Sequence, residues 1–404
     1  MQRNKSDYIL VGMPDAAPLA WATVHRNLLL SHHWFAGGTR HYELVKHLLP
    51  PTHHWIEIRM PLKDFLKQLS KVDGTVVIFA SGDPLFFGIG NTIQRAFPEA
   101  TIENHPAPSS LQLLAMQLRQ NFGLFRCVSL TGRPWKELDR CLLMGERKLA
   151  ILTDRKKTPA IIAQRLLEYG YGHYHMTVGE RMGGTAEKIT EGTLDEIKDK
   201  SFDHPNCLLL QAGEESGFGP HKGLDESEFI HLEGRPNMIT KLPVRLTVLA
   251  AMQLSRRRVF WDVGSCTGSM AIEAQLQAPH LLVKAFEKRV NSKQLITANA
   301  RRFGAPGIQI VEGDFLSSGG LQTDRPDAVF LGGYGGKMTA LLDVIHNQLK
   351  VGGVLAFNAV SNQSKERFCQ WLAQHQYPIT TSYQVQLAPH QPINIILAQK
   401  PKEK

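Results

Sequence analysis

The sequence has little cysteine and no long apolar run. Its five cysteines are spread over 404 residues and none stands in a C-x-x-C pair, so the spacing favours neither a disulfide framework nor a zinc site and fits a reducing compartment. No run approaches the roughly 18 apolar residues of a membrane span, and the N-terminal residues lack the apolar core of a signal peptide. We therefore expect a cytoplasmic protein without a membrane partner.

Acidic residues are outnumbered by basic ones, which leaves a formal net charge of +9. This excess predicts an anionic partner, either a nucleic acid, an acidic small molecule or a membrane surface. The basic residues are dispersed, and short clusters such as Arg256, Arg257 and Arg258 form no basic tail. At roughly 150 residues per domain, the length predicts two or three domains.

In the second half, residues 259–276 read VFWDVGSCTGSMAIEAQL. The pattern predicts a buried strand, a glycine-containing turn and a helix, which is how an α/β sheet presents a helix N-terminus to a nucleotide-like ligand. The turn lacks the G-x-G-x-x-G of a dinucleotide site and the Lys-Ser/Thr ending of a P-loop. NAD, a flavin, a nucleotide phosphate and S-adenosylmethionine all remain possible ligands of such a turn.

The rest of the chain alternates strand-like and helical segments around a polar, glycine-rich stretch. We predict an α/β protein with a first domain over 1–212, a linker over 213–223 and a second domain over 224–404. In the first domain, residues 8–11 predict a short apolar strand that ends at Gly12, and helical or mixed sequence is expected from there to Pro50. The run TVVIFA (75–80) predicts a strand that ends at the turn SGDPLFFGIG (81–90). In the second domain, seven strand-like runs predict a doubly wound, parallel sheet: VFWDVG, LLVKAFE, IQIVEGD, DAVFLGG, GVLAFNAV, ITTSYQVQLA and INIILAQ.

Two carboxylates follow strands of the second domain at suggestive positions. Glu287 ends the second strand about twenty residues after the turn, where a carboxylate can accept hydrogen bonds from both ribose hydroxyls. Asp314 follows the third strand, where it could face the amine of an adenine. A surface charge for Glu287 and a turn residue for Asp314 are the structural alternatives. Glycines at 332, 333, 335 and 336 leave room for a bulky substrate.

The second half resembles the Rossmann-like S-adenosylmethionine-dependent methyltransferases. The segments EFIHLEGRPNMITKLPVR, WDVGSCTGS, DAVFLGGYGG and GGVLAFNAV are similar to the family of decarboxylating precorrin-6B methyltransferases, with Cys266 where the family turn has its central glycine. The resemblance implies a set of residues that bind S-adenosylmethionine: Gly264, Ser265, Thr267, Gly268, Glu287 and Asp314.

The first half resembles the tetrapyrrole methylase family, which has a two-lobed α/β fold. The similarity lies in SGDPLFFGIG, PSSLQLL, SLTGR, TDRKKTPAIIA and VGERMGG, while GMPDAA (12–17) replaces the family's glycine-rich first loop. It implies cofactor-binding roles for Gly82, Asp83, Pro84 and Ser110. A tight turn without a ligand is the alternative for the first of these segments.

The fused pair resembles the family of decarboxylating precorrin-6Y C5,15-methyltransferases. The resemblance implies methylation at C5 by the first half, methylation at C15 with loss of the C12 acetate carboxyl by the second, and a homo-oligomer. A polycarboxylate tetrapyrrole would explain the positive charge. We predict Lys241 and Asn358 as catalytic residues, and Arg245, Gly333 and Tyr334 as substrate-binding residues. For Lys241 and Arg245, the alternative is a solvated charge at a helix end. For Asn358 it is a turn at a strand end, and for Tyr334 it is a surface aromatic.

Two other functions remain open at this stage. A basic Rossmann-like methylase suits an RNA backbone, although no interleaved aromatic and basic patch or RNA-binding module is visible, and we predict no nucleic-acid partner. A cofactor-binding scaffold without activity is the third reading, motivated by Cys266 and the altered first loop. The histidine pairs at 32–33 and 53–54 lack further ligands at matching spacing, so we predict no metal site.

Overall fold

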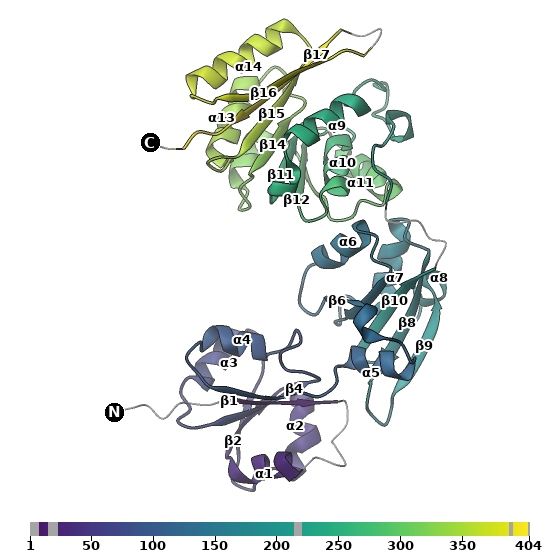
Figure 1. Cartoon of the computed structure of the whole chain (residues 1–404), viewed down its shortest axis with the longest axis vertical. Coiled ribbons are helices and arrows are strands. Elements are labelled where there is room, and N and C mark those ends of the chain that lie inside the picture. Colours follow the sequence, from purple (N-terminus) through teal and green to yellow (C-terminus); the bar gives the residue numbers. More distant parts are fainter. Residues whose placement is uncertain (1–7, 15–22, 214–219, 388–390, 403–404) are drawn as a thin grey trace. The chain divides into compact units, whose positions relative to one another are not determined.

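The computed structural model of the chain describes residues 8–14, 23–213, 220–387 and 391–402 (Figure 1). These residues form two compact units. The first unit takes in the described residues within Met1–Arg133, Arg147–Gln164 and His173–Glu214, and the second unit takes in those within Pro134–Glu146, Arg165–Gly172 and Glu215–Lys404. Strands and helices alternate in both units, which confirms the α/β class.

The first sheet is parallel throughout and has the strand order β3-β2-β4-β1-β5. Its strands are β1 (Tyr8–Met13), β2 (Trp34–Gly37), β3 (His54–Glu57), β4 (Val76–Ser81) and β5 (Ile102–His105). The helices between them are α1 (Thr23–Ser31), α2 (Thr39–Val45), α3 (Leu62–Leu69) and α4 (Gly90–Ala96). The expectation of helical or mixed sequence up to Pro50 misses β2, which consists of four residues only.

The second sheet is mixed and has the order β6-β7-β10-β8-β9. Its strands are β6 (Arg126–Ser129), β7 (Lys148–Leu152), β8 (Tyr174–Glu180), β9 (Lys188–Thr193) and β10 (Asn206–Ala212). The helices in this part of the chain are α5 (Ser110–Gln117), α6 (Lys136–Leu143), α7 (Pro159–Glu168) and α8 (Leu194–Ile197). Thr158 accepts a hydrogen bond from the N–H of Ile161 at the start of α7.

The sheet of the second unit has the order β13-β12-β11-β14-β15-β17-β16. Its strands are β11 (Val259–Val263), β12 (Leu282–Glu287), β13 (Gln309–Glu312), β14 (Ala328–Leu331), β15 (Val354–Ala359), β16 (Ile379–Val385) and β17 (Ile393–Gln399). Its helices are α9 (Leu242–Ala251), α10 (Ser269–Gln277), α11 (Ser292–Arg302), α12 (Phe315–Ser318), α13 (Met338–Gln348) and α14 (Asn362–Gln374). All seven strands lie where the sequence predicts them, but β16 and β17 run antiparallel to their neighbours.

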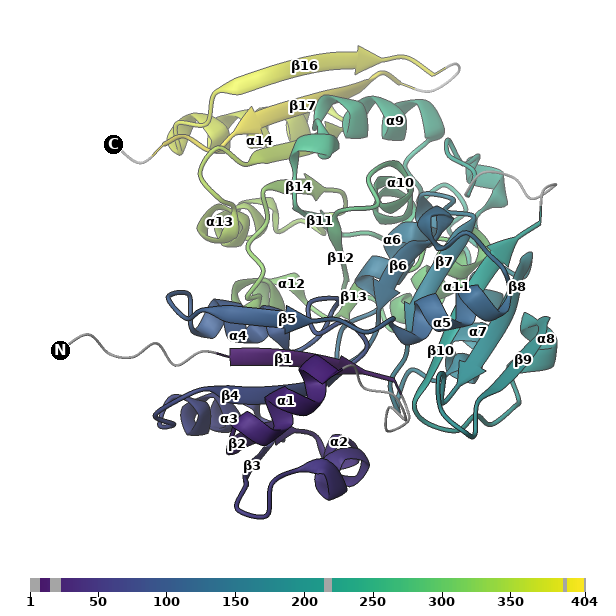
Figure 2. The ribbon, with the colours of Figure 1, turned by 60° about the horizontal axis from the view of Figure 1, so that its bottom comes forward.

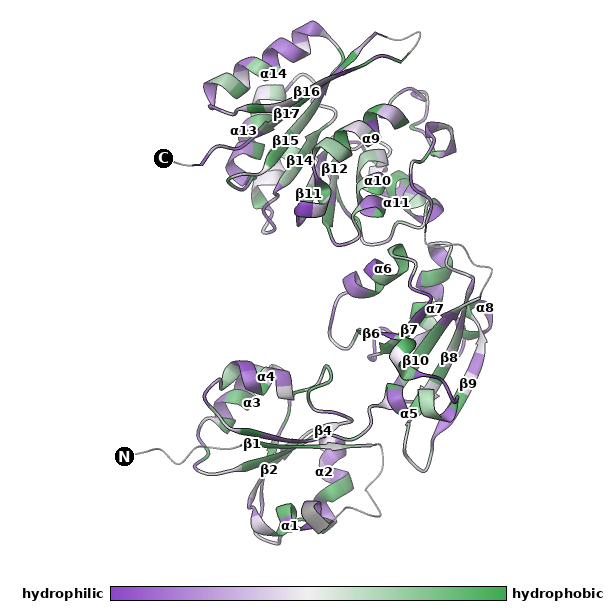
Figure 3. Cartoon of the chain, in the orientation of Figure 1, coloured by the Kyte–Doolittle hydropathy of each residue, from purple (hydrophilic) through white to green (hydrophobic). Residues whose placement is uncertain are grey.

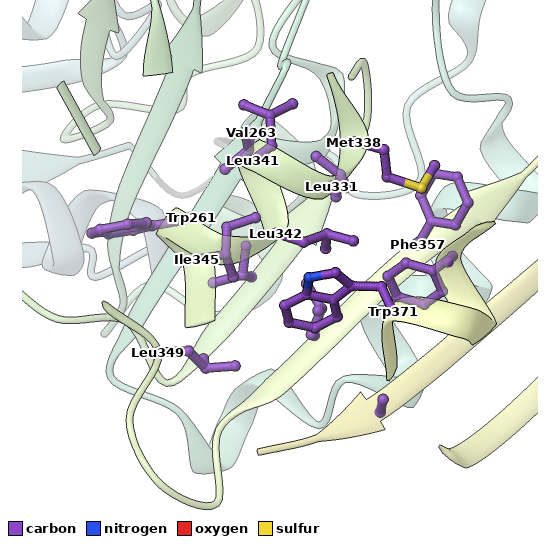
Figure 4. Close-up of a cluster of buried hydrophobic side chains, with 14 of the residues drawn as sticks. Trp261, Val263, Leu331, Met338, Leu341, Leu342, Ile345, Leu349, Phe357 and Trp371 are labelled. Atoms are coloured by element: carbon purple, nitrogen blue, oxygen red, sulfur yellow. The ribbon is translucent and has the colours of Figure 1, made fainter. Parts of the chain in front are cut away.

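Alternate residues of β11 point to opposite faces of this sheet. Trp261 packs with Leu342 of α13 and Trp371 of α14 on one face (Figure 4), whereas Phe260 packs with residues of α9 and α10 on the other. Figures 1 and 2 show these two pairs of helices on opposite sides of the sheet, and its central strands are strongly apolar (Figure 3). The loops after β11, β12, β13 and β14 therefore meet at one edge of a sheet covered on both faces.

Candidate active sites

The turn after β11 holds two loops of the second unit in close contact. Gly264 has φ +78°, and a Cβ added to it would lie 2.5 Å from the backbone nitrogen of Gly333 and equally close to the carbonyl oxygen of that residue. No residue with a side chain fits this position without moving the loop after β14. The turn after β11 and the loop after β14 are therefore in direct backbone contact.

Cys266 in the same turn has φ +53°, in the left-handed region that favours glycine. Its N–H donates to Oε2 of Glu287 at 2.8 Å, and its thiol donates to the carbonyl oxygen of Met238 at 3.0 Å. Burial raises the pKa of the Cys266 thiol, which keeps it protonated as a donor. Cys266 therefore adopts a backbone conformation that glycine adopts more readily.

Glu287 is 3% exposed at the end of β12. Its Oε1 accepts a hydrogen bond from the N–H of Arg289 at 3.2 Å and pairs with Nη1 of the same arginine at 3.0 Å. Asp314 begins α12, where its Oδ1 accepts from the N–H of Leu316 at 3.0 Å. The side chain of Asp314 stays half exposed, with Nζ of Lys337 3.8 Å from its Oδ2.

These loops surround a pocket of about 340 Å³ in the second unit, here called the second-unit pocket. Ligand pockets commonly begin at about 300 Å³. Five of the predicted site residues line it together: Gly264, Glu287, Asp314, Gly333 and Tyr334. Four cationic side chains also line it, and none of them was predicted from sequence: Arg235, Lys288, Arg289 and Lys337.

The other predicted cofactor residues of the turn, Ser265, Thr267 and Gly268, lie beside this pocket but do not line it. Ser265 donates its N–H to the carbonyl oxygen of Phe286 at 3.0 Å. The hydroxyl of Thr267 is buried and has no hydrogen-bond partner among the described residues. Direct contact of these three residues with a cofactor stays a prediction.

The two predicted catalytic residues also lie outside the second-unit pocket. Lys241 precedes α9, and its Nζ lies 3.5 Å from Oε1 of Glu226. Asn358 is in β15, one residue beyond Phe357, which pairs with Leu331 of β14. Its Oδ1 is buried without a hydrogen-bond partner in the described part of the chain. Their catalytic roles stay predictions.

The predicted role of Arg245 as a substrate ligand is wrong, because its side chain is 0% exposed. The guanidinium pairs with Glu273 of α10 at 3.3 Å and donates to the carbonyl oxygens of Thr240 and Leu224. Glu273 in turn accepts from the N–H of Leu224 at 3.1 Å. Arg245 therefore fastens the segment before α9 to α10 and presents no atom to a substrate.

Asp262, the last but one residue of β11, is also fully buried. Its Oδ2 accepts from the N–H of Ala271 at 3.1 Å, and its Oδ1 has no partner among the described residues. Burial raises the pKa of this carboxyl to about 8. A largely protonated Asp262 supports the N-terminus of α10 directly behind the turn.

In the first unit, the turn after β4 has the same kind of close approach. Gly82 has φ +61°, and an added Cβ would lie 2.7 Å from Cα of Ser109. Gly82 donates its N–H to the carbonyl oxygen of Met13 at 2.9 Å. The turn after β4 is therefore packed against the segments that follow β1 and β5.

A pocket of about 380 Å³ lies along this turn and is here called the first-unit pocket. Of the predicted cofactor residues, Gly82 and Ser110 line it. Asp83 and Pro84 do not, since Asp83 accepts from the N–H of Leu85 at 2.9 Å and the Pro84 carbonyl accepts from the N–H of Gly90. Both shape the turn, and their contact with a cofactor stays a prediction.

Several polar residues that line the first-unit pocket were not predicted from sequence: Arg40, His41, Ser81, Ser129, Thr131, Thr153 and Asn206. Thr153 donates its hydroxyl to the carbonyl oxygen of Asn206 at 2.6 Å, and Thr131 donates to the carbonyl oxygen of Thr153 at 2.9 Å. Thr131, Thr153 and Asn206 are separated by 22 and 53 positions along the chain, so their proximity depends on the pairing of the strands that carry them.

Among the described residues, no helix combines the length and the apolar character that crossing a membrane requires. In the same part of the chain, no three His, Cys, Asp or Glu side chains gather in a way that could hold a metal ion.

Two family models match the chain. The model described as Tetrapyrrole (Corrin/Porphyrin) Methylases matches residues 33–198, and the model described as Precorrin methyltransferase domain matches residues 234–402. The matches thus fall on the two halves that the sequence patterns distinguish.

Curated relatives match across both halves. A precorrin-6Y C(5,15)-methyltransferase (decarboxylating) from a Sinorhizobium species is 33% identical over 332 residues, which cover 80% of this chain and 78% of the relative. A protein of the same name from Mycobacterium tuberculosis is 31% identical over 76% of this chain and 75% of the relative. A cobalt-precorrin-6B C(15)-methyltransferase (decarboxylating) from Salmonella typhimurium is 36% identical over 33% of this chain and 69% of the relative. The chain therefore belongs to the family of decarboxylating precorrin-6Y C(5,15)-methyltransferases, enzymes of cobalamin biosynthesis.

Proposed function

We propose that this chain methylates C5 and C15 of precorrin-6B and removes the carboxyl group of the C12 acetate arm, with S-adenosylmethionine as methyl donor. In this proposal residues 1–212 carry the C5 methylation, residues 224–404 carry the C15 methylation and the decarboxylation, and residues 213–223 link them. The observation that carries the proposal is that each unit has its own pocket beside a glycine turn at the carboxyl end of a parallel strand.

The hydrogen-bond acceptors that line the second-unit pocket suit S-adenosylmethionine. A carboxylate has about four lone-pair positions, and Glu287 uses three of them, for the N–H of Cys266 and for the N–H and Nη1 of Arg289, so it can still accept from one ribose hydroxyl. The exposed Oδ2 of Asp314 can accept from an adenine amine. Gly264 and Gly333 line the same pocket, and their close backbone contact holds the loops after β11 and β14 together at its edge.

The cationic rim of this pocket suits a substrate with several carboxylates. Arg235 and Arg289 can bind carboxylates in a bidentate manner, and Lys288 and Lys337 can add charge. Arg289 is the least available of the four, because it pairs with Glu287. We therefore assign acetate and propionate arms first to Arg235, Lys288 and Lys337, with Tyr334 against the macrocycle.

The reaction asks for alignment more than for acid or base strength. The bound cofactor supplies an electrophilic methyl group, and the protein has to hold the substrate carbon in line with it. The decarboxylation releases carbon dioxide and leaves its electron pair on the conjugated macrocycle, which a water-poor surrounding of the carboxylate favours. We assign to Asn358 and Lys241 the contacts near the reacting ring, and the unpartnered Oδ1 of Asn358 supports this.

Mass spectrometry of the products tests the proposal. Precorrin-6B incubated with S-adenosylmethionine and the full chain should gain two methyl groups and lose one carbon dioxide. A tetrapyrrole of unchanged mass, with protein that is folded by circular dichroism, would contradict it.

A further inference from the structure

Another pocket of the first unit lies beside the first-unit pocket and is here called the arginine pocket. Its volume is about 570 Å³, which is within the range of ligand pockets. Phe86 and Phe87 line both pockets, so a ligand in the arginine pocket would lie next to one in the first-unit pocket. Two arginines, two phenylalanines and two amides are among its lining residues: Arg95, Arg133, Phe86, Phe87, Asn91 and Gln94.

The two arginines reach this pocket from separate elements. Arg95 lies on α4, four positions after Asn91 and hence on the same helix face, and its Nε donates to the carbonyl oxygen of Asn91 at 3.1 Å. Arg133 follows β6, in a turn where its N–H donates to the carbonyl oxygen of Leu130 at 3.1 Å. The fold thus brings two guanidinium groups from distant parts of the sequence to one pocket.

Both arginines are exposed, and neither pairs with a carboxylate in the described part of the chain. Arg95 uses only Nε within the protein, so its two terminal nitrogens stay available as donors. No Asp or Glu stands among the described residues that line the pocket. The arginine pocket therefore favours an anion, and a guanidinium can bind a carboxylate in a bidentate manner.

Phe87 adds an aromatic surface in a backbone conformation that is costly for its side chain. Its φ is +57°, in the left-handed region, and such outliers cluster at functional sites. The guanidinium carbon of Arg133 lies 5.0 Å from the centroid of its ring, and the ring of Phe86 meets it edge to face with centroids 4.8 Å apart. Phe87 is half-buried between the two pockets, where its ring can contact a planar ligand.

We propose that the arginine pocket holds the tetrapyrrole during C5 methylation, with Arg95 and Arg133 on its acetate or propionate carboxylates and Phe87 against the edge of its macrocycle. The inference rests on the proposed function, because it takes the methyl acceptor to be a polycarboxylate tetrapyrrole. The first-unit pocket contains the predicted cofactor residues Gly82 and Ser110. Donor and acceptor therefore meet beside Phe87, which brings the macrocycle edge to the methyl group.

Steady-state kinetics of C5 methylation by the full chain test this assignment. Isotope-labelled methyl groups from S-adenosylmethionine let NMR distinguish the products at C5 and C15. We expect Arg95→Ala and Arg133→Ala each to raise the KM for precorrin-6B by about 3- to 10-fold, because an exposed charge pair contributes less than a buried one. The double variant should raise it by about 10- to 100-fold. The KM for S-adenosylmethionine should stay near the wild-type value.

Three matched variants report on the chemistry of the pocket. Arg133→Lys keeps the charge but loses the bidentate geometry, so its KM should lie between those of the wild type and Arg133→Ala. Phe87→Leu keeps an apolar side chain without the aromatic ring and should raise the KM for precorrin-6B by about 2- to 10-fold. Arg155 is exposed and lines neither pocket, so Arg155→Ala controls for the loss of one positive charge.

The C15 reaction of the same protein is the internal control. It is assigned to residues 224–404, so its KM for precorrin-6B should not change in the double variant. A wild-type KM for precorrin-6B in C5 methylation by the double variant would overturn the assignment. A rise in the KM for S-adenosylmethionine alone would overturn it too, because the pocket would then hold the methyl donor.

Calorimetric titration of the full chain with precorrin-6B separates this proposal from the proposed function. If the wild type transfers no methyl group to C5, the proposed function fails. Loss of one bound equivalent of precorrin-6B in the double variant would then still support the arginine pocket, and an unchanged stoichiometry and affinity would overturn it. If the wild type methylates C5 and the double variant binds and reacts as the wild type does, the pocket fails and the proposed function stands.

Discussion

Gly264 is the residue at which the loops after β11 and β14 touch. Gly264→Ala adds a Cβ that would lie 2.5 Å from the Gly333 nitrogen, at φ +78°. We expect it to lower the free energy of unfolding by more than the about 1–2 kcal/mol that a left-handed backbone alone costs an L-residue. It should also weaken binding of S-adenosylmethionine in the second unit, which calorimetric titration measures.

Gly234→Ala is the control for this substitution. Gly234 has φ +67° with nothing within 4 Å of an added Cβ, so it isolates the backbone cost from the contact with Gly333. Urea unfolding of both variants measures the difference. Equal losses of stability in the two variants would show that the loops do not approach each other as closely as described.

Asp262 should make the stability of the second unit depend on pH. Its pKa is raised by burial to about 8, against an ordinary value of 3.8, so between these values the folded chain holds a proton that the unfolded chain has lost. Stability therefore falls as pH rises through this window. Asp262→Asn stays neutral, and we expect its stability relative to the wild type to increase with pH by on the order of 1 kcal/mol per unit.

Urea unfolding at pH 5, 7 and 9, followed by tryptophan fluorescence, tests this expectation. Asp262→Asn keeps a side chain of the same shape, so the comparison reports the charge. Parallel pH profiles for the two proteins would mean that the carboxyl is already ionised in the folded state.

Sequence patterns could place the residues that a single strand and turn bring together. Glu287 and Gly264 line the second-unit pocket as expected, because parallel neighbouring strands end at the same edge. The contact of Arg40 with Ser81 was not predictable, since it depends on the pairing of β2 with β4. Arg245 was misread because charge alone does not reveal burial, although one arginine in the apolar helix LPVRLTVLAA is itself a signal.

At the scale of elements, α9 and α10 are joined through a buried ion pair. Arg245 and Glu273 are both 0% exposed, and removal of one partner leaves the other charge buried without compensation. We expect Arg245→Met to lower the free energy of unfolding by about 3–5 kcal/mol. Thermal and urea unfolding measure this loss.

The same variant distinguishes a structural role from a substrate clamp. Arg245→Met together with Glu273→Leu should recover much of the lost stability, because both charges are then gone. The KM for the tetrapyrrole should stay near the wild-type value at temperatures where the variant is folded. A raised KM for the tetrapyrrole with unchanged stability would instead support the predicted role of Arg245 as a substrate ligand.

Among the elements, those of the second unit were predictable and several of the first were not. Each of the seven strand-like runs after residue 258 is a strand, and most of them are apolar, although β16 (ITTSYQV) is largely exposed. By contrast, β2 and β3 have four residues each and contain Trp34 and His54, which stack at 4.3 Å. Such short strands are recognised by their partners in the sheet, and sequence alone does not supply those partners.

At the scale of the molecule, the net charge of +9 was informative but not specific. It predicted an anionic partner, and the structure places cations at both pockets: Arg40 in the first unit, and Arg235, Lys288 and Lys337 in the second. Neither pocket could be outlined from composition. Family membership, shown by relatives that span both halves, joins the two pockets in one pathway.

The central claim is that each unit has its own methyl-transfer site and that the second also decarboxylates. The most direct measurement is the product mass from precorrin-6B and S-adenosylmethionine with three full-length proteins: wild type, Gly82→Ala and Glu287→Gln. We predict that Gly82→Ala, whose added Cβ meets Ser109, still removes carbon dioxide and adds one methyl group at C15, whereas Glu287→Gln loses the C15 methylation, which depends on the cofactor of the second unit. Loss of C15 methylation in Gly82→Ala, or its full survival in Glu287→Gln, would contradict this account.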